Sequence, residues 1–387
     1  MKTSDLFIGT VSHIYAYSLN IVILTLMLLM SIILFQQHRR KKAYLSLTVS
    51  IFFIIAQYFL FILFESLDQL DSTLFTYIAQ FLKVITFILL NTGIYQLYNT
   101  FRTKQYVLFN SSIGFAFLLS LLHFFAPKWF DQSTGQLHLM QDLGLELYLF
   151  VLIFLSFSII APRIGQNYKY QLGLTVFFII QLTNMVNRYM YDQAQPLLAG
   201  LVNFLPVLYY GILFLILFQR VVELMQASYT NSITDGLTGL YNRRYFVNRL
   251  NQYIKNDIPV SLIFLDIDNF KKLNDTKGHQ KGDEALRHVA SILKESTEEF
   301  GLCGRYGGEE MVVMVTDPSI TVGDLAEEIR QKSEKHAGVT VSIGYSVYRK
   351  GLTAETLLKQ ADEAMYNAKS TGKNKVVKYT KQTMINI

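Results

Sequence analysis

The pattern of apolar and polar residues divides the chain into two parts of different character. Up to about residue 218, long apolar runs alternate with short polar loops, whereas from about residue 234 apolar positions recur at the spacings of ordinary helices and strands. We therefore expect an all-α membrane bundle over 1–218, a helical linker over 219–233 and a mixed α/β domain over 234–380.

The apolar runs of the first part have the length of about 20 residues that a helix needs to cross a bilayer. The first run is too long for a cleavable signal peptide and has no small-residue cleavage site after it, so it is expected to remain a span. We predict about seven transmembrane helices. The runs are 13–35, 43–64, 73–98, 106–126, 143–161, 172–191 and 198–218.

Positive charge gathers in alternate loops of this bundle. The N-terminus and the loops after the second, fourth and sixth runs offer only Lys2 and Lys128. Because positively charged loops stay on the cytoplasmic side, we predict a multi-pass cell-membrane protein with its N-terminus outside and its C-terminal domain in the cytoplasm. The loops after the first, third and fifth runs carry Arg39, Arg40, Lys41, Lys42, Arg102, Lys104, Arg163 and Lys169.

A few polar residues interrupt the apolar runs, namely Lys83, Glu146, Asn184, Asn187 and Arg188. Ionisable groups are costly inside a membrane, so one interpretation is a pocket for an unidentified ligand. The other is snorkelling or hydrogen bonding between helices, which we favour for Glu146 and Arg188 because they lie near the ends of their runs. Membrane lipid is an expected partner in either case.

Composition supports this division and narrows the function. The chain is 51% hydrophobic and 17% charged, with a net charge of +6. Much of the basic excess flanks the apolar runs, so we do not expect a nucleic-acid partner. The single cysteine, Cys303, excludes an internal disulfide and fits a reducing cytoplasm. In the linker, Val222, Met225 and Tyr229 have helical spacing, which fits a short two-stranded coiled coil or a plain linker equally well.

The second part alternates strands with helices, which predicts a mixed sheet covered by helices. Adjacent glycines, Gly307 and Gly308, permit the backbone angles of a tight hairpin, and Gly372 ends the last helix. The predicted elements are a strand at 260–265, a helix after Asp283, a hairpin over 301–315, a strand at 339–347 and a helix over 353–370.

Two acidic clusters follow predicted strands: Asp266 with Asp268, and Glu309 with Glu310. Each cluster alone fits a solvated hairpin. Together they favour one cleft with hard oxygen ligands, the kind that bind a magnesium ion also held by phosphate and water.

Phosphate binding is suggested by the polar segment 266–282 that follows the first strand. It has the composition of a loop whose backbone N–H groups and Lys271 wrap a phosphate. Lys369 and Lys373, at the end of the last helix and just after it, are placed to contact terminal phosphates. The alternatives are a solvated lysine for Lys271 and a favourable interaction with the helix dipole for the other two.

Five segments of the second part stand out, in this order: DGLTGLYNRR (235–244), DIDNFKKLNDTKGHQKGDEAL (266–286), GRYGGEEM (304–311), VSIGYS (341–346) and ADEAMYNAKSTGKNKV (361–376). In order and spacing they resemble the GGDEF family of diguanylate cyclases. The resemblance covers nearly the whole second part and none of the membrane part. It implies a nucleotidyl-cyclase-like α+β sandwich with a mixed central sheet.

The resemblance also implies roles for individual residues. Asp266, the carbonyl of Ile267 and Glu309 correspond to the metal ligands, for Mg²⁺ or Mn²⁺, and Glu309 and Glu310 to the catalytic signature. Asn274 and Asp283 correspond to the guanine-binding residues; a helix N-cap is the alternative for Asp283. The further substrate-binding positions are Asn269, Phe270, Lys271, Lys369 and Lys373.

The family's reaction condenses two GTP into cyclic di-GMP and releases two pyrophosphates, which implies a transferase that works as a homodimer in signal transduction. Three departures are present. Met311 replaces a phenylalanine and is expected to pack; Lys373 replaces an arginine and loses its bidentate fork. Glu298 and Gly301 replace the Arg and Asp of the product-inhibition motif, so inhibition there is not expected.

The expected function is therefore a diguanylate cyclase regulated through an N-terminal, sensory membrane domain. One alternative is a catalytically silent module that binds GTP or a partner protein. Another is a cyclase that makes a one-base cyclic nucleotide, which shares the metal chemistry and not the five segments. The retained carboxylates Asp266, Glu309 and Glu310 favour the enzyme.

Overall fold

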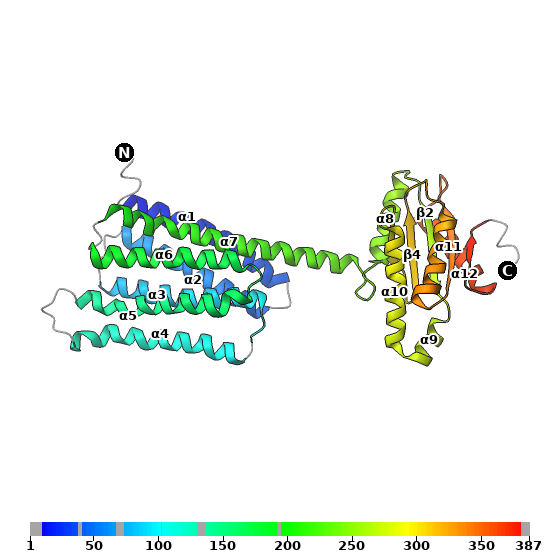
Figure 1. Ribbon diagram of the computed structural model, residues 1–387. Helices are drawn as coiled ribbons and strands as arrows, with labels where there is room; N and C mark the ends of the chain where they lie inside the picture. Colours follow the sequence, from blue (N-terminus) through cyan, green and yellow to red (C-terminus); the bar gives the residue numbers. More distant parts are fainter. Residues whose placement is uncertain are drawn as a thin grey trace. The chain divides into compact units, whose positions relative to one another are not determined.

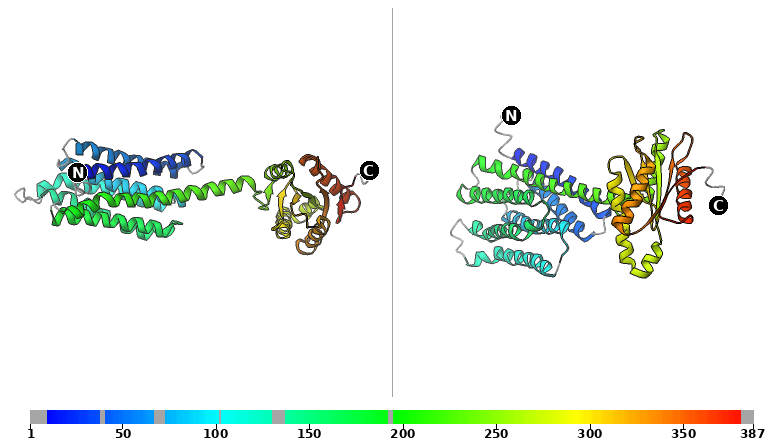
Figure 2. Two further views of the ribbon diagram at one scale, coloured as in Figure 1. Left: turned by 90° about the horizontal axis from the view of Figure 1, so that it is seen from above. Right: turned by 45° about the vertical axis from the view of Figure 1, so that its right-hand side comes forward.

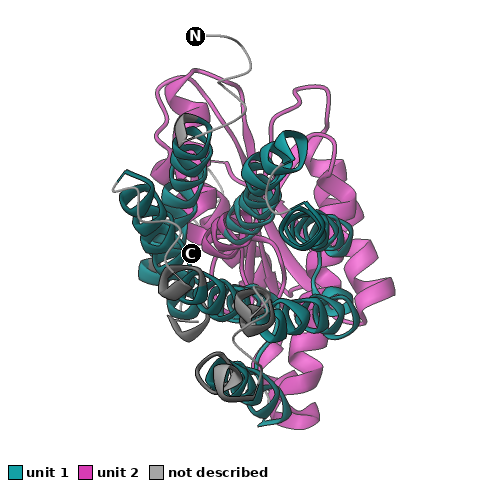
Figure 3. Ribbon diagram, turned by 90° about the vertical axis from the view of Figure 1, so that its left-hand side faces the viewer, with its two compact units in different colours: residues 1–224 teal, residues 225–387 magenta. Residues whose placement is uncertain are grey.

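The structure, a computed structural model, describes residues 10–37, 41–66, 73–101, 103–129, 137–191 and 195–380. The chain forms two compact units, residues 1–224 and 225–387 (Figure 3). The boundary falls inside one long helix, α7, which is continuous from the first unit into the second.

The first unit is a bundle of long helices (Figure 1). Each of the predicted apolar runs coincides with a helix in the described part of the chain. The helices are α1 (Thr10–Gln37), α2 (Lys41–Ser66), α3 (Thr73–Tyr98), α4 (Thr103–Trp129), α5 (Leu137–Leu155), α6 (Asn167–Met190) and α7 (Pro196–Ile233). A π-helical turn (Ser156–Ile160) and a 3₁₀ turn (Ala161–Arg163) extend α5.

Length and hydropathy within the described residues identify 5 helices able to cross a membrane. The α4 and α6 helices are not among them, so the prediction of about seven spans is unconfirmed for these two. Polar residues near the ends of α6 lower its mean hydropathy. The spans are Ser12–Gln36, Tyr44–Ser66, Tyr77–Tyr98, Leu143–Arg163 and Pro196–Ile233.

Apolar packing holds this bundle together, with small residues where helices approach closely. A Cβ built on Gly93 of α3 would lie 2.9 Å from the Cα of Leu47 on α2, so this contact requires glycine. Large apolar side chains such as Phe52 and Phe154 remain exposed on the outer faces. An apolar outer surface is compatible with a membrane anchor.

One ionic interaction inside the bundle confirms an alternative raised by the sequence. Arg188 of α6 donates to Glu146 of α5 at 3.0 Å, and Gln80 of α3 donates to the same oxygen at 3.0 Å. These residues therefore pair between helices, as the sequence interpretation favoured for Glu146 and Arg188. Four basic residues on which the predicted orientation rests lie outside the described residues: Lys2, Arg39, Arg40 and Arg102.

The second unit has a six-stranded mixed sheet with the order β1-β3-β4-β2-β5-β6. The central pairs are antiparallel, and the outer pairs β1–β3 and β5–β6 are parallel. This confirms the predicted mixed sheet. The strands are β1 (Tyr241–Asn242), β2 (Ser261–Ile267), β3 (Gly301–Arg305), β4 (Glu310–Val315), β5 (Val341–Val347) and β6 (Val376–Lys378).

Helices cover both faces of the sheet (Figures 1 and 2). Alternate residues of β2 face opposite sides: Ile263 and Leu265 pack with α10 and α11, and Leu262 and Phe264 pack with α8 and α12. A strand buried on both faces reads as a continuous apolar run, as β2 does. The helices are α8 (Arg243–Lys255), α9 (Phe270–Lys277), α10 (His279–Thr297), α11 (Val322–Lys332) and α12 (Ala354–Ser370), with a π-helical turn at Ser333–Ala337.

Two local predictions in this unit were wrong. The segment expected to be a phosphate-binding loop is mostly helical, because it forms α9 and the start of α10 around Gly278. Gly278 has φ +84°, which allows the chain to turn sharply between the two helices. Since α10 begins at His279, Asp283 lies inside the helix and is not its N-cap.

Other local predictions are confirmed. The hairpin of β3 and β4 turns at the two glycines, and α12 ends before Gly372, which has φ +124°. Met311 is fully buried in the core, so the replacement of an aromatic residue does not leave it unpacked. The linker is helical, with Met225 and Tyr229 exposed on α7. A two-stranded coiled coil and a plain linker both stay predictions for Val222, Met225 and Tyr229.

Candidate active site

The centre of the site is Asp266, near the end of β2. It lies opposite Glu310 of β4 and Ser342 of β5 in the sheet register, so two strands enclose it. Its side chain is on the α8 and α12 side of the sheet, because it shares the alternation of Leu262 and Phe264. Only 3% of the residue is exposed. The sequence therefore places an acid at a buried position of a central strand.

Lys369 of α12 partly compensates this buried charge. Its Nζ lies 2.7 Å from Oδ2 of Asp266, whereas Oδ1 is buried and has no hydrogen-bond partner among the described residues. Burial raises the pKa of Asp266 to about 6, Lys369 acts to lower it, and the nearby Glu309 and Glu310 act to raise it. An unpaired carboxylate oxygen next to other acids is a position that a cation would stabilise.

The glycine turn brings the second pair of acids to Asp266. The amide N–H groups of Tyr306 and Gly307 both donate to the carbonyl of Glu310, at 2.9 and 3.3 Å, and this closes the bend that presents Glu309. A Cβ on Gly307 would lie 2.4 Å from Oε2 of Glu310, so the Glu310 carboxylate is folded over the turn. Burial raises the pKa of Glu310, and Asp362 on α12 adds to this effect.

Asp235 and Arg305 hold the turn from outside and were not identified from the sequence. Arg305 donates to the carbonyl of Gly308 at 2.7 Å and pairs with Asp235 at 3.0 Å. Asp235 also accepts hydrogen bonds from the backbone N–H and the hydroxyl of Thr238. Burial acts to raise the pKa of Asp235, but the hydrogen bonds from Thr238 and Arg305 together keep it below its usual value. Their position in the quoted DGLT and GRYGG segments is the signal that was available.

Arg243 and Tyr306 form a second unpredicted support. The Arg243 guanidinium lies 4.2 Å from the Tyr306 ring centroid and donates to its hydroxyl at 3.1 Å. Tyr306 packs edge-on against Phe264 of β2. Arg243 is also close enough to lower the pKa of Glu310, so it contributes positive charge to the site.

The start of α9 faces the loop after α12. Asn269, with φ +55°, precedes α9 and makes no side-chain cap, so the first N–H groups of the helix are not capped by it. Lys373, with φ +61°, donates from Nζ to Oδ1 of Asn269 at 2.6 Å. Uncapped N–H groups and a lysine together form a suitable site for a phosphate. The structure thus brings together two predicted substrate residues that are far apart in sequence.

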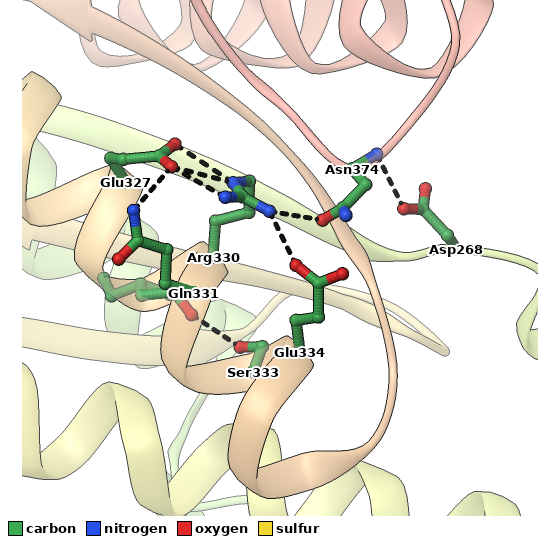
Figure 4. Close-up of polar contacts among 8 residues, drawn as sticks. Asp268, Glu327, Arg330, Gln331, Ser333, Glu334 and Asn374 are labelled. Atoms are coloured by element: carbon green, nitrogen blue, oxygen red, sulfur yellow. Dashed lines mark hydrogen bonds and ion pairs between the residues drawn. The ribbon is translucent and has the colours of Figure 1, made fainter.

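Asp268 differs from Asp266 and serves to hold this loop. Its Oδ1 accepts a hydrogen bond from the Ser342 hydroxyl at 2.6 Å, and its Oδ2 accepts one from the backbone N–H of Asn374 at 3.0 Å. Figure 4 shows Asn374 between Asp268 and Arg330 of α11, which donates to its side chain at 2.8 Å. Both oxygens of Asp268 bind the protein, whereas Asp266 keeps one oxygen free, so the sharing of a metal cleft by the two acids stays a prediction. Arg330 was not anticipated.

Asn274 and Asp283, the expected guanine-binding pair, lie where α9 meets α10. A Cβ on Gly282 would lie 2.0 Å from Oδ1 of Asn274 and 3.2 Å from the Phe270 ring, so Gly282 allows both side chains to pack on α10. Asp283 follows Gly282 directly and is half-buried. Lys271, in contrast, is exposed on the first turn of α9.

The residues present fit a divalent cation held jointly with phosphate. Within the described residues, no group of three or more His, Cys, Asp or Glu side chains is arranged as a complete metal site. The free Oδ1 of Asp266 and the neighbouring Glu309 and Glu310 supply hard oxygen donors instead. Ile267 directly follows Asp266 and its side chain is buried in the core. A partial oxygen set of this kind suits Mg²⁺, which keeps water and substrate phosphate as ligands.

Acids with a free oxygen, lysines beside an uncapped helix N-terminus, and an Asn–Asp pair at a helix junction are thus the groups that the sequence predicted for a nucleotide site. Residues 232–375 match the family model described as "Diguanylate cyclase, GGDEF domain". The second unit of this chain belongs to that family.

Curated relatives are similar to this chain over part of its length. Response regulator PleD of Caulobacter vibrioides is 43% identical over 162 residues, 38% of this chain and 36% of that protein. Diguanylate cyclase DgcS of Shewanella oneidensis is 39% identical over 149 residues, 36% of this chain and 50% of that protein. The chain thus spans half the length of these relatives or less.

A solved structure is also similar. The coiled coil and GGDEF domain of DgcB from Caulobacter crescentus, in complex with c-di-GMP, is 30% identical. The alignment covers 42% of this chain and 93% of that chain, with a TM-score of 0.40.

Proposed function

We propose that this chain is a diguanylate cyclase that condenses two GTP into cyclic di-GMP and two pyrophosphates. The observation that carries the proposal is the buried, unpaired oxygen of Asp266 beside Glu309, Glu310 and Lys369. A catalytically silent domain that only binds GTP or a partner would not need a buried, unpaired acid, because burying such a group destabilises the fold. The similarity to proteins named diguanylate cyclase supports the same activity.

Asn274 and Asp283 select guanine. A carboxylate accepts hydrogen bonds from both N1–H and the amino group of guanine, whereas adenine presents an acceptor at N1. Adenine would leave Asp283 unpaired, at a cost of about 1–3 kcal/mol. Their position at the junction of α9 and α10 supports this role.

The phosphates lie between the start of α9 and the end of α12. The uncapped N–H groups after Asn269, with Phe270 among them, donate to phosphate oxygens. Lys373 and Lys369 add positive charge, and Lys271 extends it at the exposed side. Lys373 contacts phosphate through a single ammonium, without the bidentate geometry of arginine.

Asp266, the Ile267 carbonyl and Glu309 would hold Mg²⁺ or Mn²⁺. The ion supplies charge neutralisation on the phosphoryl oxygens and a lower pKa for the attacking ribose hydroxyl. Glu309 and Glu310 lie beside Asp266, and one of them, with Glu309 the candidate from the family, accepts the proton of that hydroxyl. The raised pKa of Glu310 favours a proton acceptor at that position.

Each domain binds one GTP, so the reaction requires two domains facing each other in a homodimer. The proposed arrangement is a sensory membrane domain over 1–218, a signalling helix over 219–233 and a cyclase domain over 234–380. The protein is multi-pass in the cell membrane, with the N-terminus outside and the cyclase in the cytoplasm. The continuity of α7 into the second unit supports a route for the signal.

The test is incubation of the full chain in lipid nanodiscs with GTP and Mg²⁺, followed by chromatography of the products. We expect cyclic di-GMP from the natural chain, no product from Glu309→Gln, and full activity from the control Glu355→Gln, an exposed acid on α12. GTP binding without any product would favour the silent module. A one-base cyclic nucleotide would favour the other cyclase chemistry.

A further inference from the structure

A cavity of about 210 Å³ lies inside the first unit, among α1, α2, α3, α6 and α7. It is smaller than the usual pocket for a drug-sized ligand, so it has room only for a small molecule. All five helices contribute polar or aromatic side chains to its wall, namely Asn20, Tyr58, Lys83, Gln181, Asn203 and Tyr209.

Amide side chains in this cavity lack partners. Both polar atoms of Asn20, Nε2 of Gln181 and Nδ2 of Asn203 are buried without a hydrogen bond in the part of the chain that the structure describes. Asn20 is fully buried, and the other two are less than a tenth exposed. Unpaired buried amides each cost about 1–3 kcal/mol, so a bound polar molecule would stabilise the bundle. They supply both donors and an acceptor on the same cavity wall.

Lys83 lines the same cavity and makes no ion pair with the described residues. Among the described residues, no carboxylate lies within salt-bridge distance of its Nζ. Glu146, the acid that acts on it, binds Arg188 and Gln80 through Oε1 and makes no ion pair with Lys83. Lys83 is six residues into the span Tyr77–Tyr98, about 9 Å along the helix axis and so within the hydrocarbon core of a bilayer. A lysine at that depth is expected to pair with an anion.

Aromatic rings form the rest of the wall. Phe87 and Phe177 stack with centroids 4.8 Å apart, and Phe177 packs at 4.9 Å against Tyr209. Tyr58 meets Tyr210 edge-on at 5.9 Å. These faces suit a flat apolar body with offset stacking or edge contacts. The cavity therefore combines one cation, several unpaired amides and an aromatic wall.

The helix α7 contributes to this cavity and also enters the second unit. Pro206 removes the intrahelical hydrogen bond to the carbonyl of Val202, and both residues line the cavity. A helix with such an interruption is locally easier to bend. A molecule in the cavity would thus contact the weakest point of the helix that continues into the cyclase domain.

We propose that this cavity binds a small carboxylate-bearing molecule with an aromatic ring. Its carboxylate pairs with Lys83, its other polar groups bond to Asn20, Gln181 and Asn203, and its ring packs on the aromatic wall. The site is independent of the cyclase activity and is tested by binding alone.

The probes are 4-hydroxybenzoate, its neutral isostere 4-hydroxybenzamide, and decanoate as a carboxylate on a lipid-like chain. Thermal unfolding of the full chain in nanodiscs is followed as each probe is titrated to millimolar concentration. We expect the unfolding temperature to rise with 4-hydroxybenzoate and to change little with the benzamide. A rise with decanoate alone would assign the site to a lipid carboxylate and overturn the aromatic part of the proposal.

The variant Lys83→Met keeps the length of the side chain and removes its charge. It should weaken the response to 4-hydroxybenzoate by about tenfold or more, as expected for a lost charge-assisted contact. The matched control is Lys104→Met, an exposed lysine on α4, which should respond like the natural chain. Asn203→Leu should weaken the response without changing the preference for acid over amide.

Specific results would overturn the proposal. These are no response to any acid from a folded chain, an equal response to acid and amide, or a Lys83→Met response equal to that of the control. A failure of cyclase activity would change none of these readouts, so the two proposals fail separately.

Discussion

The ammonium group of Lys369 lies 2.7 Å from Oδ2 of Asp266, so a lysine on α12 partly neutralises the buried acid at the centre of the site. The contact leaves Oδ1 of Asp266 free. It explains how an acid can be tolerated on a central strand and still be available to a ligand.

Removing this lysine should shift the pH dependence of the reaction. Lys369 lowers the pKa of Asp266, so Lys369→Met should raise that pKa above about 6. The pH below which the reaction rate falls should then be higher in the variant. Near pH 7 the variant should be at least about tenfold slower than the natural chain. Initial rates of the nanodisc protein across pH measure this. Lys359→Met, an exposed lysine on the same helix, is the control, and an unmoved limb would contradict the assignment.

Neutralising Asp266 should abolish product and stabilise the fold. Burial raises the pKa of this acid from 3.8 to about 6, so its ionisation is less favourable in the folded state. Its contribution to stability is therefore highest below pH 4 and is lost as the pH rises through 6. At neutral pH and without divalent cation, Asp266→Asn should raise the free energy of unfolding by up to about 3 kcal/mol, the equivalent of this shift.

Thermal unfolding of Asp266→Asn at several pH values separates this effect from others. The advantage of the variant should shrink as the pH falls from about 7 to 4, because the natural acid is then protonated in the folded state and increasingly protonated in the unfolded state. A constant difference between the two proteins across this range would show that the ionisation of Asp266 is not its cause.

Gly344 should not tolerate a side chain. A Cβ there would lie 2.1 Å from the backbone nitrogen of Met365 and 2.2 Å from the carbonyl oxygen of Ala361, and a helix backbone moves less readily than a side chain. Gly344→Ala should reduce stability by about 1–3 kcal/mol or more by separating α12 from β5. Gly236→Ala, with no atom within 4 Å, is the matched control in a denaturation series. Equal stability of the two variants would contradict this close packing.

Breaking the contact between Asp235 and Arg305 should loosen the glycine turn. Asp235→Ala removes the partner of Arg305 and the acceptor for Thr238, so stability should fall by about 1–3 kcal/mol. Because the pKa of Asp235 is lowered on folding, this contribution is present above pH 4 and disappears at lower pH. Comparison of unfolding at neutral and acid pH, with the exposed Asp275→Ala as control, measures it.

Asp283 should control the choice of base. Asp283→Asn removes the ionised acceptor for guanine, so GTP binding should weaken by about 1–3 kcal/mol, and the preference for GTP over ATP should narrow. Equilibrium binding of both nucleotides to the natural chain and the variant measures this. Asp275→Asn, on the exposed side of α9, provides the control. An unchanged ratio of affinities would remove Asp283 from base recognition.

Some features of this protein follow from the sequence alone. The long apolar runs predict helices because backbone groups in a bilayer must bond within their own segment, and all the runs did become helices in the described residues. The continuous apolar run of β2 and the adjacent glycines predict a buried strand and a hairpin, and both are present. Local signals were sufficient here because each depends on short stretches of chain.

Tertiary structure decided what local signals could not. Asp266 and Asp268 are two residues apart on the same strand end, and the sequence treats them alike. Asp268 holds the loop after α12 because Ser342 and the backbone N–H of Asn374 donate hydrogen bonds to it. Asp266 has a different partner, because α12 places Lys369 beside it. The role of each acid depends on partners far away in the chain, because hydrogen-bond partners and burial are set by packing and not by neighbours in sequence.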